Sequence, residues 1–407
     1  MNQQVIYYPK EAVARAVEQF ETPFFLYEEA RLRENCRNFR ESFRKYFPDF
    51  WPLYAVKANN NPEVLRIIFE EGFGADCSSE SEAWMCKKLG AKGMYTGNYT
   101  PAAELKYAQE CGMIVNLDDI SMVDFLDELG NPEMISFRIN PGIGAGTAVL
   151  AGPDAKYGVP FEEAPKAYSL AKEKGVKKFG IHMMTGSNVL EEDYFPAVVE
   201  KLFEIMATVK KETGIEIEFM NIGGGFGVPY QPEQMSLNME KIAGDIRAVV
   251  DKQCALHGLK EPQLMAEPGR YIAADMGFLI GKVDVIKNGY KKFVGIDASS
   301  NDMPRPSIYE AYHHVSVLNA EDRPHESVSV VGKICENCDQ FAKDRDLPVC
   351  KIGDTIVIHN CGGHAYAMGH NYNGRLRHAE YLIKRDGSFK MIRRAETFED
   401  LYSTTNL

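Results

Sequence analysis

The sequence predicts an α/β protein in which a (β/α)8 TIM-type barrel is followed by a C-terminal antiparallel β-barrel or sandwich domain. From residue 51 to about residue 275, eight short apolar runs alternate with amphipathic helical stretches. Regular alternation of strand and helix indicates a parallel sheet, and eight such units close a barrel. After Asp275 the long helical stretches stop, and strand-like runs separated by turns take over. A doubly wound open sheet is the alternative for the first part.

The expected domain boundaries follow from this change of texture. Residues 24–275 are predicted to form the barrel, and residues 1–23 together with 276–407 the β domain. The expected barrel strands are, in order, LYAVK (53–57), GADCS (74–78), MYTGN (94–98), MIVNLD (113–118), ISFRIN (135–140), FGIHMM (179–184), FMNIGGG (219–225) and QLMAEPG (263–269). The β domain is expected to use GFLIGKVDVIKN (277–288), KKFVGIDAS (291–299), HHVSVLNA (313–320), ESVSVVGKIC (326–335), DTIVIHN (354–360) and AEYLIKRDGSFKMIRR (379–394).

The acidic charge balance argues against nucleic acid as a partner. The 407 residues carry a net charge of -12, and no apolar stretch is long enough to suggest a membrane span. The N-terminal MNQQVIYYPKEAV lacks the basic and apolar regions of a signal peptide, so a cytoplasmic protein is expected. Nine cysteines, an odd number, indicate reduced thiols rather than a disulfide framework.

One Cys-x-x-Cys pair, Cys335 and Cys338, has the spacing of a redox pair or of half a zinc site. The sequence contains no second such pair, and no histidine pair lies nearby at zinc-finger spacing. We therefore predict no metal site, and a single reactive cysteine stays open as an alternative.

Polar side chains gather at the C-terminal ends of the predicted strands, where function is located in barrels of this kind. Three glycines after the seventh strand can present backbone N–H groups to a phosphate, although a plain tight turn is the alternative. A lysine at a strand end is, taken alone, most simply a solvated lysine. The strand ends give, in order, Lys57, Asp76, Arg138, Asn140, His182, Gly223, Gly224, Gly225 and Glu267.

A lysine, a phosphate cradle and an acid at one barrel mouth indicate pyridoxal 5'-phosphate (PLP). The amine of Lys57 can bind the aldehyde of this cofactor covalently. A carboxylate opposite the pyridine nitrogen keeps that nitrogen protonated, so that the ring accepts electrons from the substrate. Glu267 is the candidate for this carboxylate.

Eight motifs are spread over nearly the whole chain: YAVKAN, RINP, KYGVP, NIGGGFG, EPGRYI, SSNDMPRPSIYEAYHH, ICENCD and NYNGRLRHAE. In this order they resemble the fold-type III PLP-dependent decarboxylases, which have an alanine racemase-like barrel. Within that family the resemblance is greatest to the branch that acts on diaminopimelate.

The resemblance implies a role for each matching residue. Lys57 matches the lysine that carries the cofactor, Glu267 the acid on the pyridine nitrogen, and Cys335 the cysteine that approaches from a second subunit and supplies a proton. The cofactor-binding residues implied are Lys57, Asp76, Arg138, His182, Ser187, Gly224, Gly225, Glu267, Arg270, His364 and Tyr366. The substrate-binding residues implied are Arg270, Arg305, Tyr309, Glu336 and Tyr372.

The implied substrate has a carboxylate at its far end. Arg305 and Tyr309 match residues that hold the distal carboxylate of diaminopimelate, and Glu336 matches the acid that reads its distal amino group. A fork-shaped guanidinium suits such a carboxylate because the two pair bidentately. The resemblance therefore implies decarboxylation of the small amino acid meso-2,6-diaminopimelate to L-lysine and CO2, in a homodimer with shared active sites.

Three other functions compete with this one. Decarboxylation of D-lysine, D-ornithine or another ω-substituted amino acid would leave Arg305 without a distal carboxylate. A PLP-dependent racemase of this fold is expected to place an arginine, rather than Glu267, near the pyridine nitrogen. A non-catalytic homologue would not need Lys57 and Cys335.

Two positions depart from the family's pattern. In GIHMMTGSN, Met184 stands where a histidine usually stacks on the cofactor, and His182 lies two residues earlier on the same face of the strand. In CGGHAYAMGHNYN, His364 stands where a tyrosine usually contacts cofactor or substrate, with Tyr366 two residues later. These departures bear on the substrate rather than on PLP binding.

Overall fold

A computed structural model of the chain describes residues 7–130, 132–143 and 150–406. The chain divides into two compact units. The barrel unit comprises Glu34–Val228 and Ser236–Tyr271, and the β unit comprises Met1–Arg33, Pro229–Met235 and Ile272–Leu407. Residues 24–33, which were expected in the barrel, belong to the β unit, because the first strand of the chain pairs with other strands of that unit. Residues 229–235 and 272–275, also expected in the barrel, belong to the β unit as well.

Eight parallel strands close the barrel, as the sequence predicted. Their order around the barrel is β5-β4-β3-β2-β10-β9-β8-β6, and the pairing of β5 with β6 closes the ring. A two-residue strand, β7 (Val159–Pro160), pairs with β6. The barrel strands are β2 (Trp51–Ala55), β3 (Gly74–Cys77), β4 (Gly93–Tyr95), β5 (Met113–Leu117), β6 (Met134–Asn140), β8 (Lys178–His182), β9 (Ile217–Asn221) and β10 (Gln263–Ala266).

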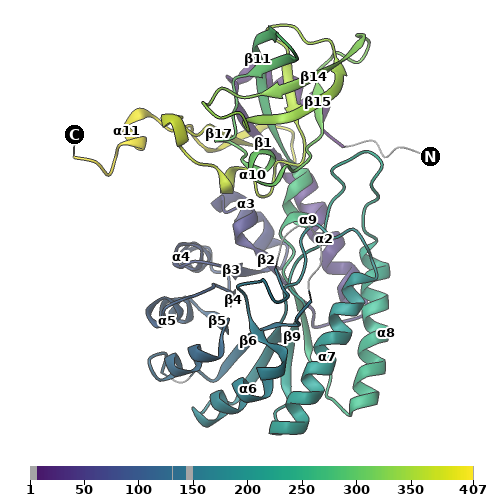
Figure 1. The fold of residues 1–407 in the computed structure, drawn as a ribbon, viewed down its shortest axis with the longest axis vertical. Helices are drawn as coiled ribbons and strands as arrows, with labels where there is room; N and C mark the ends of the chain where they lie inside the picture. Colours follow the sequence, from purple (N-terminus) through teal and green to yellow (C-terminus); the bar gives the residue numbers. More distant parts are fainter. Residues whose placement is uncertain (1–6, 131, 144–149, 407) are drawn as a thin grey trace. The chain divides into compact units, whose positions relative to one another are not determined.

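Helices cover the outside of the barrel strands (Figure 1). Pro62 begins the helix after the first barrel strand, where its fixed φ and missing N–H are tolerated. Gly214 and Gly258, both left-handed, end the two long helices α7 and α8. The helices of this part of the chain are α2 (Glu29–Arg44), α3 (Pro62–Glu70), α4 (Glu80–Lys88), α5 (Ala102–Glu110), α6 (Ala164–Glu173), α7 (Tyr194–Thr213) and α8 (Met239–His257), with the 3-10 turns η1 (Val56–Ala58), η2 (Ile120–Asp127) and η3 (Phe161–Glu163).

Apolar side chains from several strands pack together as one core of the barrel. Leu53, Met94, Phe219 and Met265 come from four different strands, are at most 2% exposed and form one cluster. A packed core of this kind is typical of an eight-stranded barrel, whose centre is not a pore. The polar ends of the strands are therefore the part of the barrel that remains for chemistry.

The β unit is built on a nine-stranded mixed sheet. Its main order is β15-β14-β12-β11-β1-β17-β18, and β13 pairs with β16, which pairs with β11. The expectation of a purely antiparallel domain is corrected in two places, because β1 runs parallel to β17 and β12 parallel to β14. Each parallel pair is separated by a long stretch of chain, which parallel pairing requires. The strands are β1 (Phe24–Glu28), β11 (Gly277–Asn288), β12 (Lys292–Ile296), β13 (Val315–Val317), β14 (His325–Val331), β15 (Gln340–Pro348), β16 (Thr355–Ile358), β17 (Ala379–Ile383) and β18 (Phe389–Arg393).

Two strands of this sheet were not predicted. Four of the five residues of β1 are buried, and the strand lies between β11 and β17. β15 contains the charged run Lys343 to Asp346 and lies at an edge of the sheet, where charges discourage pairing with other chains. That run of charges hides the strand from a search for apolar alternation.

The core of the β unit joins the first helix, α1 (Lys10–Gln19), to the sheet. Val13 and Ala16 of this helix form one buried cluster with residues of β1, β11, β16 and β17. The remaining helical elements are α9 (Arg270–Ala273), η4 (Ala274–Met276), α10 (Arg305–Tyr309), η5 (Tyr366–Met368), η6 (Tyr372–Gly374) and α11 (Phe398–Leu401). Within the described ranges, no helix has the length and apolar character needed to cross a membrane.

Candidate active site

The polar residues predicted at the barrel mouth lie at the C-terminal ends of five strands. Asp76 is near the end of β3, Arg138 near the end of β6, and His182 is the last residue of β8. Lys57 and Glu267 follow β2 and β10 within two residues. Because the strands are parallel and the barrel is closed, these ends meet at one mouth.

Lys57 lies on a single 3-10 turn, η1, that directly follows β2. Two buried asparagines fix the chain after it. Asn59 Oδ1 accepts a hydrogen bond from Asn61 N at 3.0 Å, and Asn61 Oδ1 accepts one from Glu63 N at 3.0 Å, which caps α3. Two of the three asparagines in this run therefore hold the turn that carries the lysine.

The Lys57 amine lies next to a fully buried carboxylate. Lys57 Nζ is 3.8 Å from Asp76 Oδ2, and the lysine side chain is about half exposed. Thr96, just after β4, donates a hydrogen bond to the other oxygen, Asp76 Oδ1. Asp76 Oδ2 has no hydrogen-bond partner among the residues that the structure describes. Such an oxygen is costly to bury, which points to a functional reason for keeping it.

The buried position of Asp76 changes its protonation. Burial is the largest cause that raises the pKa of Asp76 to about 6, and the charge of Glu267 raises it further. Lys57 opposes this shift and lowers the pKa. Asp76 therefore gains or loses its proton close to neutral pH, beside a lysine amine.

Glu267 is the centre of a second buried network. Its Oε1 accepts a hydrogen bond from Asn221 Nδ2 at 2.7 Å, and its Oε2 lies 3.1 Å from His182 Nε2. His182 Nδ1 lies 3.1 Å from Asn116 Nδ2, so both ring nitrogens are engaged. Burial alone would raise the pKa of Glu267, but His182 and, more weakly, Lys57 and Asn221 hold it below its usual value. The carboxylate is therefore ionised at neutral pH and accepts from His182 Nε2–H.

The glycine turn after β9 leaves no room for side chains. A Cβ on Gly223 would lie 2.4 Å from Met183 O, and one on Gly224 would lie 2.6 Å from Glu267 O. Gly223 and Gly225 also have left-handed backbone, with φ of +70° and +89°. Asn221 Oδ1 accepts from Gly223 N at 2.9 Å and so ties this turn to the Glu267 network. The turn thus presents bare backbone at the strand end.

The segment after β8 runs beside this glycine turn. Val189 N donates to Gly225 O at 2.9 Å, and Gly227 N donates to Val189 O at 3.0 Å. Half-buried Ser187 belongs to this segment. Gly224 N donates to the thioether of Met184 at 3.1 Å, so Met184 lies against the predicted phosphate cradle while His182 lies in the Glu267 network. Met184, which stands at the family's stacking position, and His182, two residues earlier, therefore have different surroundings.

Arg138 and Arg270 complete the predicted set in the barrel unit. Arg138 is 7% exposed, and its Cζ lies 4.4 Å from the centroid of the Tyr157 ring. Its Nη2 donates to Leu150 O at 3.2 Å and to Met184 O at 3.5 Å, so it braces the segment after β8. Arg270 begins α9, three residues after Glu267.

In the β unit, Arg305 and Tyr309 lie on the same short helix, α10. Arg305 is 7% exposed, whereas Tyr309 is 62% exposed. Arg305 Nη1 donates to Tyr230 Oη at 3.0 Å and lies 2.7 Å from His313 Nε2. The guanidinium therefore contacts two neutral groups of the β unit, and neither Tyr230 nor His313 was predicted as a site residue.

The structure brings together three predicted residues that are far apart in sequence. Cys335 and Glu336 lie exposed on the turn between β14 and β15. Tyr372 Oη donates to Glu336 Oε1 at 2.9 Å, and Cys335 N donates to Asn373 Oδ1 at 2.6 Å. The turn and the NYN segment thus form one exposed surface, which we call the CEN surface.

The CEN surface is held from beneath by the SSND segment that precedes α10. Ser300 N donates to Asp339 Oδ1 at 2.7 Å, and Ile334 N donates to Asp339 Oδ2 at 3.0 Å. Asn301 Nδ2 donates to Tyr372 O at 2.8 Å. The supporting roles of Asp339 and Asn301 were not predicted. Both residues lie within motifs that also contain predicted site residues, and this was the one sign in the sequence that they act there.

His364 and Tyr366 are not part of the CEN surface as described. His364 is half-buried and has left-handed backbone, with φ of 56°. Tyr366 is buried, and its ring centroid lies 3.7 Å from Arg377 Cζ and 4.8 Å from Arg393 Cζ. Tyr366 therefore packs against two arginines of the β unit, and its predicted contact with a cofactor stays a prediction.

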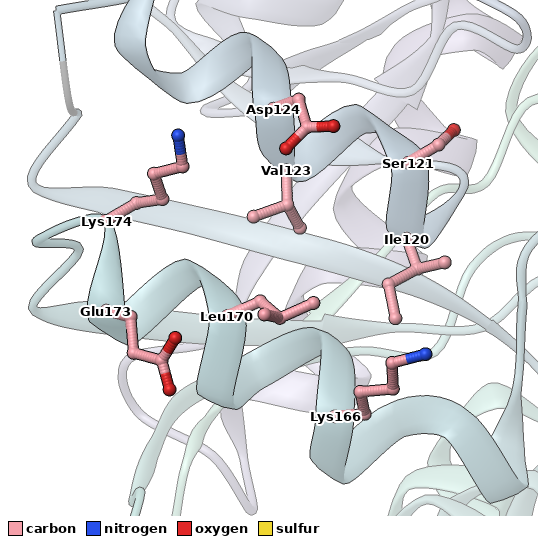
Figure 2. A pocket seen from close by; sticks show the side chains of 8 residues that line it. All are labelled: Ile120, Ser121, Val123, Asp124, Lys166, Leu170, Glu173 and Lys174. Carbon is pink, nitrogen blue, oxygen red and sulfur yellow. The ribbon is translucent and has the colours of Figure 1, made fainter.

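A cavity of about 410 Å³ lies elsewhere, on the outer layer of the barrel unit. Figure 2 shows side chains of η2, such as Val123, and of α6, such as Leu170, on its two sides. It contains no residue of the predicted site. The candidate site is therefore identified by its chemical groups rather than by the size of a pocket.

Comparison with known proteins gives three findings. The sequence pattern of a family described as "Pyridoxal-dependent decarboxylase, pyridoxal binding domain" matches residues 29–274. Diaminopimelate decarboxylase of Methanothermobacter thermautotrophicus is 38% identical over 399 residues, which cover 96% of this chain and 93% of the relative. Protein TabA of Pseudomonas amygdali pv. tabaci is 38% identical over 386 residues, which cover 94% and 90%. Two relatives with different names thus have the same percentage identity to this chain.

A solved structure agrees with the fold over nearly the whole length. The crystal structure of diaminopimelate decarboxylase from M. jannaschii in complex with L-lysine has a TM-score of 0.89 and 31% identity. The match covers 97% of this chain and 94% of that one.

Proposed function

The chain belongs to the family of pyridoxal-dependent decarboxylases, and we propose that it removes CO2 from the D-centre of meso-2,6-diaminopimelate to give L-lysine. It is a PLP-dependent carboxy-lyase that acts on a small amino acid. The observation that carries the choice of substrate is the buried guanidinium of Arg305, which two neutral groups hold in place. A fixed guanidinium suits a planar carboxylate at the far end of a substrate.

The residues at the barrel mouth fit PLP on three counts. The half-exposed Lys57 amine adjoins a buried carboxylate oxygen that has no hydrogen-bond partner within the described ranges. The glycine turn presents bare backbone, and Gly224 N donates to a thioether, a weak acceptor that a phosphate oxygen would replace favourably. Glu267 is held ionised, as a partner of a protonated pyridine nitrogen must be.

We assign the barrel residues to distinct tasks. The chemistry that PLP supplies when bound is an electron sink for the electron pair that CO2 leaves on Cα. Lys57 would hold the cofactor covalently through Nζ. Asp76, which titrates near neutral pH, would exchange a proton with Lys57 Nζ. Glu267 would hold the proton on the pyridine nitrogen, while His182 and Asn221 keep its carboxylate oriented.

The β unit would read the substrate and complete the reaction. Arg305 and Tyr309 would bind the distal carboxylate, and Glu336, oriented by Tyr372, the distal amino group. The Cys335 thiol would give its proton to the carbon from which CO2 departs, so that a hydrogen replaces the carboxylate there.

We also propose that two copies of the chain pair, with Cys335 and Glu336 of one copy serving the cofactor site of the other. The exposure of both residues on the CEN surface supports this arrangement, because a proton donor must be accessible to the site it serves. None of the nine cysteines, which all lie in the described ranges, forms a disulfide bond, which supports the cytoplasm as the location.

The proposed function is tested by CO2 release from purified, PLP-loaded protein. The substrates offered in parallel are meso-diaminopimelate, L,L-diaminopimelate, D-lysine, D-ornithine and L-ornithine. We expect turnover of the meso isomer, and its loss in the Arg305→Ala variant. Turnover of lysine or ornithine in place of the meso isomer would overturn the proposal. It would also connect the changes at Met184 and His364 with a different substrate.

A further inference from the structure

We propose that His313 is a positioning residue for substrate recognition, which orients Arg305 toward the carboxylate at the far end of the substrate. The inference rests on the proposed function, because it takes that carboxylate to be the ligand of Arg305. His313 is fully buried, at 0% exposure, so it acts through the arginine rather than by touching the substrate.

The two contacts of the imidazole define its state. A guanidinium nitrogen only donates, so the 2.7 Å contact from Arg305 Nη1 requires an unprotonated His313 Nε2. A carbonyl oxygen only accepts, so the 2.8 Å contact between His313 Nδ1 and His359 O requires a proton on Nδ1. Both contacts select the same neutral tautomer. His313 thus links a cation at one edge to a backbone carbonyl at the other.

Tyr230 supports the same arginine from a second direction. Its hydroxyl accepts from Arg305 Nη1 at 3.0 Å, and its ring centroid lies 4.9 Å from Arg305 Cζ. The Tyr230 ring also meets the His313 ring edge to face, with 5.0 Å between centroids and 74° between planes. Arg305, Tyr230 and His313 therefore form one packed cluster that fixes the guanidinium at Nη1.

The anchor of this cluster is the sheet rather than the helix that carries Arg305. The helix α10 has five residues and ends at Tyr309, before Glu310, which has left-handed backbone. His313, in contrast, precedes β13, and Arg345 Nη1 of β15 donates to its carbonyl at 3.1 Å. His359, whose carbonyl oxygen accepts the hydrogen bond from His313 Nδ1, follows β16. A site group is more precisely placed when its support lies on regular elements.

This arrangement predicts a loss that is specific for ligands with the distal carboxylate. L-Lysine and cadaverine form a matched pair, because they differ by the carboxylate that remains after decarboxylation at the D-centre. The PLP-loaded protein is titrated with each ligand by calorimetry. We expect wild type to bind L-lysine more tightly than cadaverine.

The His313→Leu variant removes both hydrogen bonds at similar volume. Its dissociation constant for L-lysine should rise by about 10- to 100-fold, as expected for a lost hydrogen bond to a charged group. The dissociation constant for cadaverine should stay within about twofold of wild type. His325→Gln, at an exposed histidine of the same unit, is the matched control and should change neither constant.

Two polar variants keep the test decisive if the leucine variant does not fold. His313→Gln places an amide oxygen near the position of Nε2 and should restore L-lysine binding to within about threefold of wild type. His313→Asn reaches only the position of Nδ1 and should behave like the leucine variant. Circular dichroism and thermal unfolding identify the variants that are folded.

A double-mutant comparison separates positioning from general damage. In the Arg305→Ala background, a second change at His313 should weaken L-lysine binding no further, because the group it orients is gone. Additive losses, parallel losses for L-lysine and cadaverine, or unchanged L-lysine binding in folded His313→Leu and His313→Asn would each overturn the inference alone. A wild type that does not prefer L-lysine to cadaverine would overturn the proposed function and the inference with it.

Discussion

The two units hold their candidate site residues in opposite ways. In the barrel unit Asp76, His182 and Glu267 are buried and bonded to one another or to neighbouring polar groups. In the β unit the residues of the CEN surface are exposed on turns, and Arg305 is the buried exception. Buried networks fix charge and protonation, whereas exposed turns present groups to a ligand.

This difference fits the proposed division of tasks, in which the barrel unit binds the cofactor and the β unit selects the substrate. The barrel unit shifts the pKa of Asp76 upward and that of Glu267 downward, although both are carboxylates buried in one unit. The raised pKa suits Asp76 for proton exchange, and the lowered pKa suits Glu267 for a constant negative charge. The β unit holds Arg305, Tyr309 and Glu336, which we propose to bind the far end of the substrate. Changes in the barrel unit should therefore affect turnover of every substrate, as should a change at the proposed proton donor Cys335. Changes at Arg305 or Glu336 in the β unit should instead affect the choice among substrates.

The largest effect is expected at Lys57. Lys57→Ala should abolish the covalent cofactor absorbance and lower kcat by roughly a thousandfold or more for any substrate. Absorbance spectra and CO2 release measure the two quantities. The control is Lys178→Ala, which removes an exposed lysine at the opposite end of β8. Retained covalent absorbance in Lys57→Ala would assign the cofactor to another amine.

A smaller effect is expected from Gly224→Ala in the glycine turn. The new Cβ would lie 2.6 Å from Glu267 O, so the turn must move. The free energy of unfolding should fall by about 1–3 kcal/mol, and PLP affinity should fall with it. Gly289→Ala is the control, because its Cβ would meet only Lys291 O at an ordinary 3.8 Å. Unchanged PLP affinity in Gly224→Ala would remove this turn from the phosphate site.

The raised pKa of Asp76 predicts a pH-dependent stability. A carboxyl whose pKa is 3.8 when unfolded and about 6 when folded binds its proton more tightly in the folded state. Its contribution is therefore fully present below pH 3.8 and is lost as the pH rises to 6. This loss amounts to roughly 2–3 kcal/mol. The Asp76→Asn variant should not show this loss. The difference between its free energy of unfolding and that of wild type should therefore increase between pH 3.8 and about 6. Denaturant titration of the cofactor-free protein at pH 4, 5, 6 and 7 measures the difference. A difference that is constant with pH would contradict the shifted pKa.

The smallest effect on stability is expected on the CEN surface. Tyr372→Phe removes the exposed hydrogen bond to Glu336, and the free energy of unfolding should stay close to that of wild type because the bond is solvent-exposed. The KM for meso-diaminopimelate should nevertheless rise about threefold, because Glu336 loses the group that orients it. A large fall in stability would mean that this surface is structural.

Much of the barrel could be predicted from the sequence because its signals are local. Each of the eight strands is a short apolar run, and the polar residue that follows marks the strand end. The β unit was harder to predict for two reasons. β15 is an edge strand whose charges mask its alternation, and the residues of β1 pair with residues at least 250 positions later in the chain.

The same distinction applies to the site. Lys57, Asp76 and Glu267 could be proposed from the sequence because they lie at strand ends or just after them. Asn221 and Thr96, in contrast, act as hydrogen-bond donors that only the assembled barrel reveals. His313 could not be predicted, since its partner Arg305 and its anchor His359 are joined by the fold and not by spacing.

The separation of chemistry from recognition is tested most directly by comparing two variants on two substrates. The quantity measured is the ratio of kcat/KM for meso-diaminopimelate to that for D-lysine, in wild type, Glu267→Gln and Arg305→Ala. We expect Glu267→Gln to lower both values together and leave the ratio unchanged. Arg305→Ala should lower the ratio by about a hundredfold, as expected for a lost buried charge pair with the substrate. A ratio that falls in Glu267→Gln, or that survives in Arg305→Ala, would contradict the account.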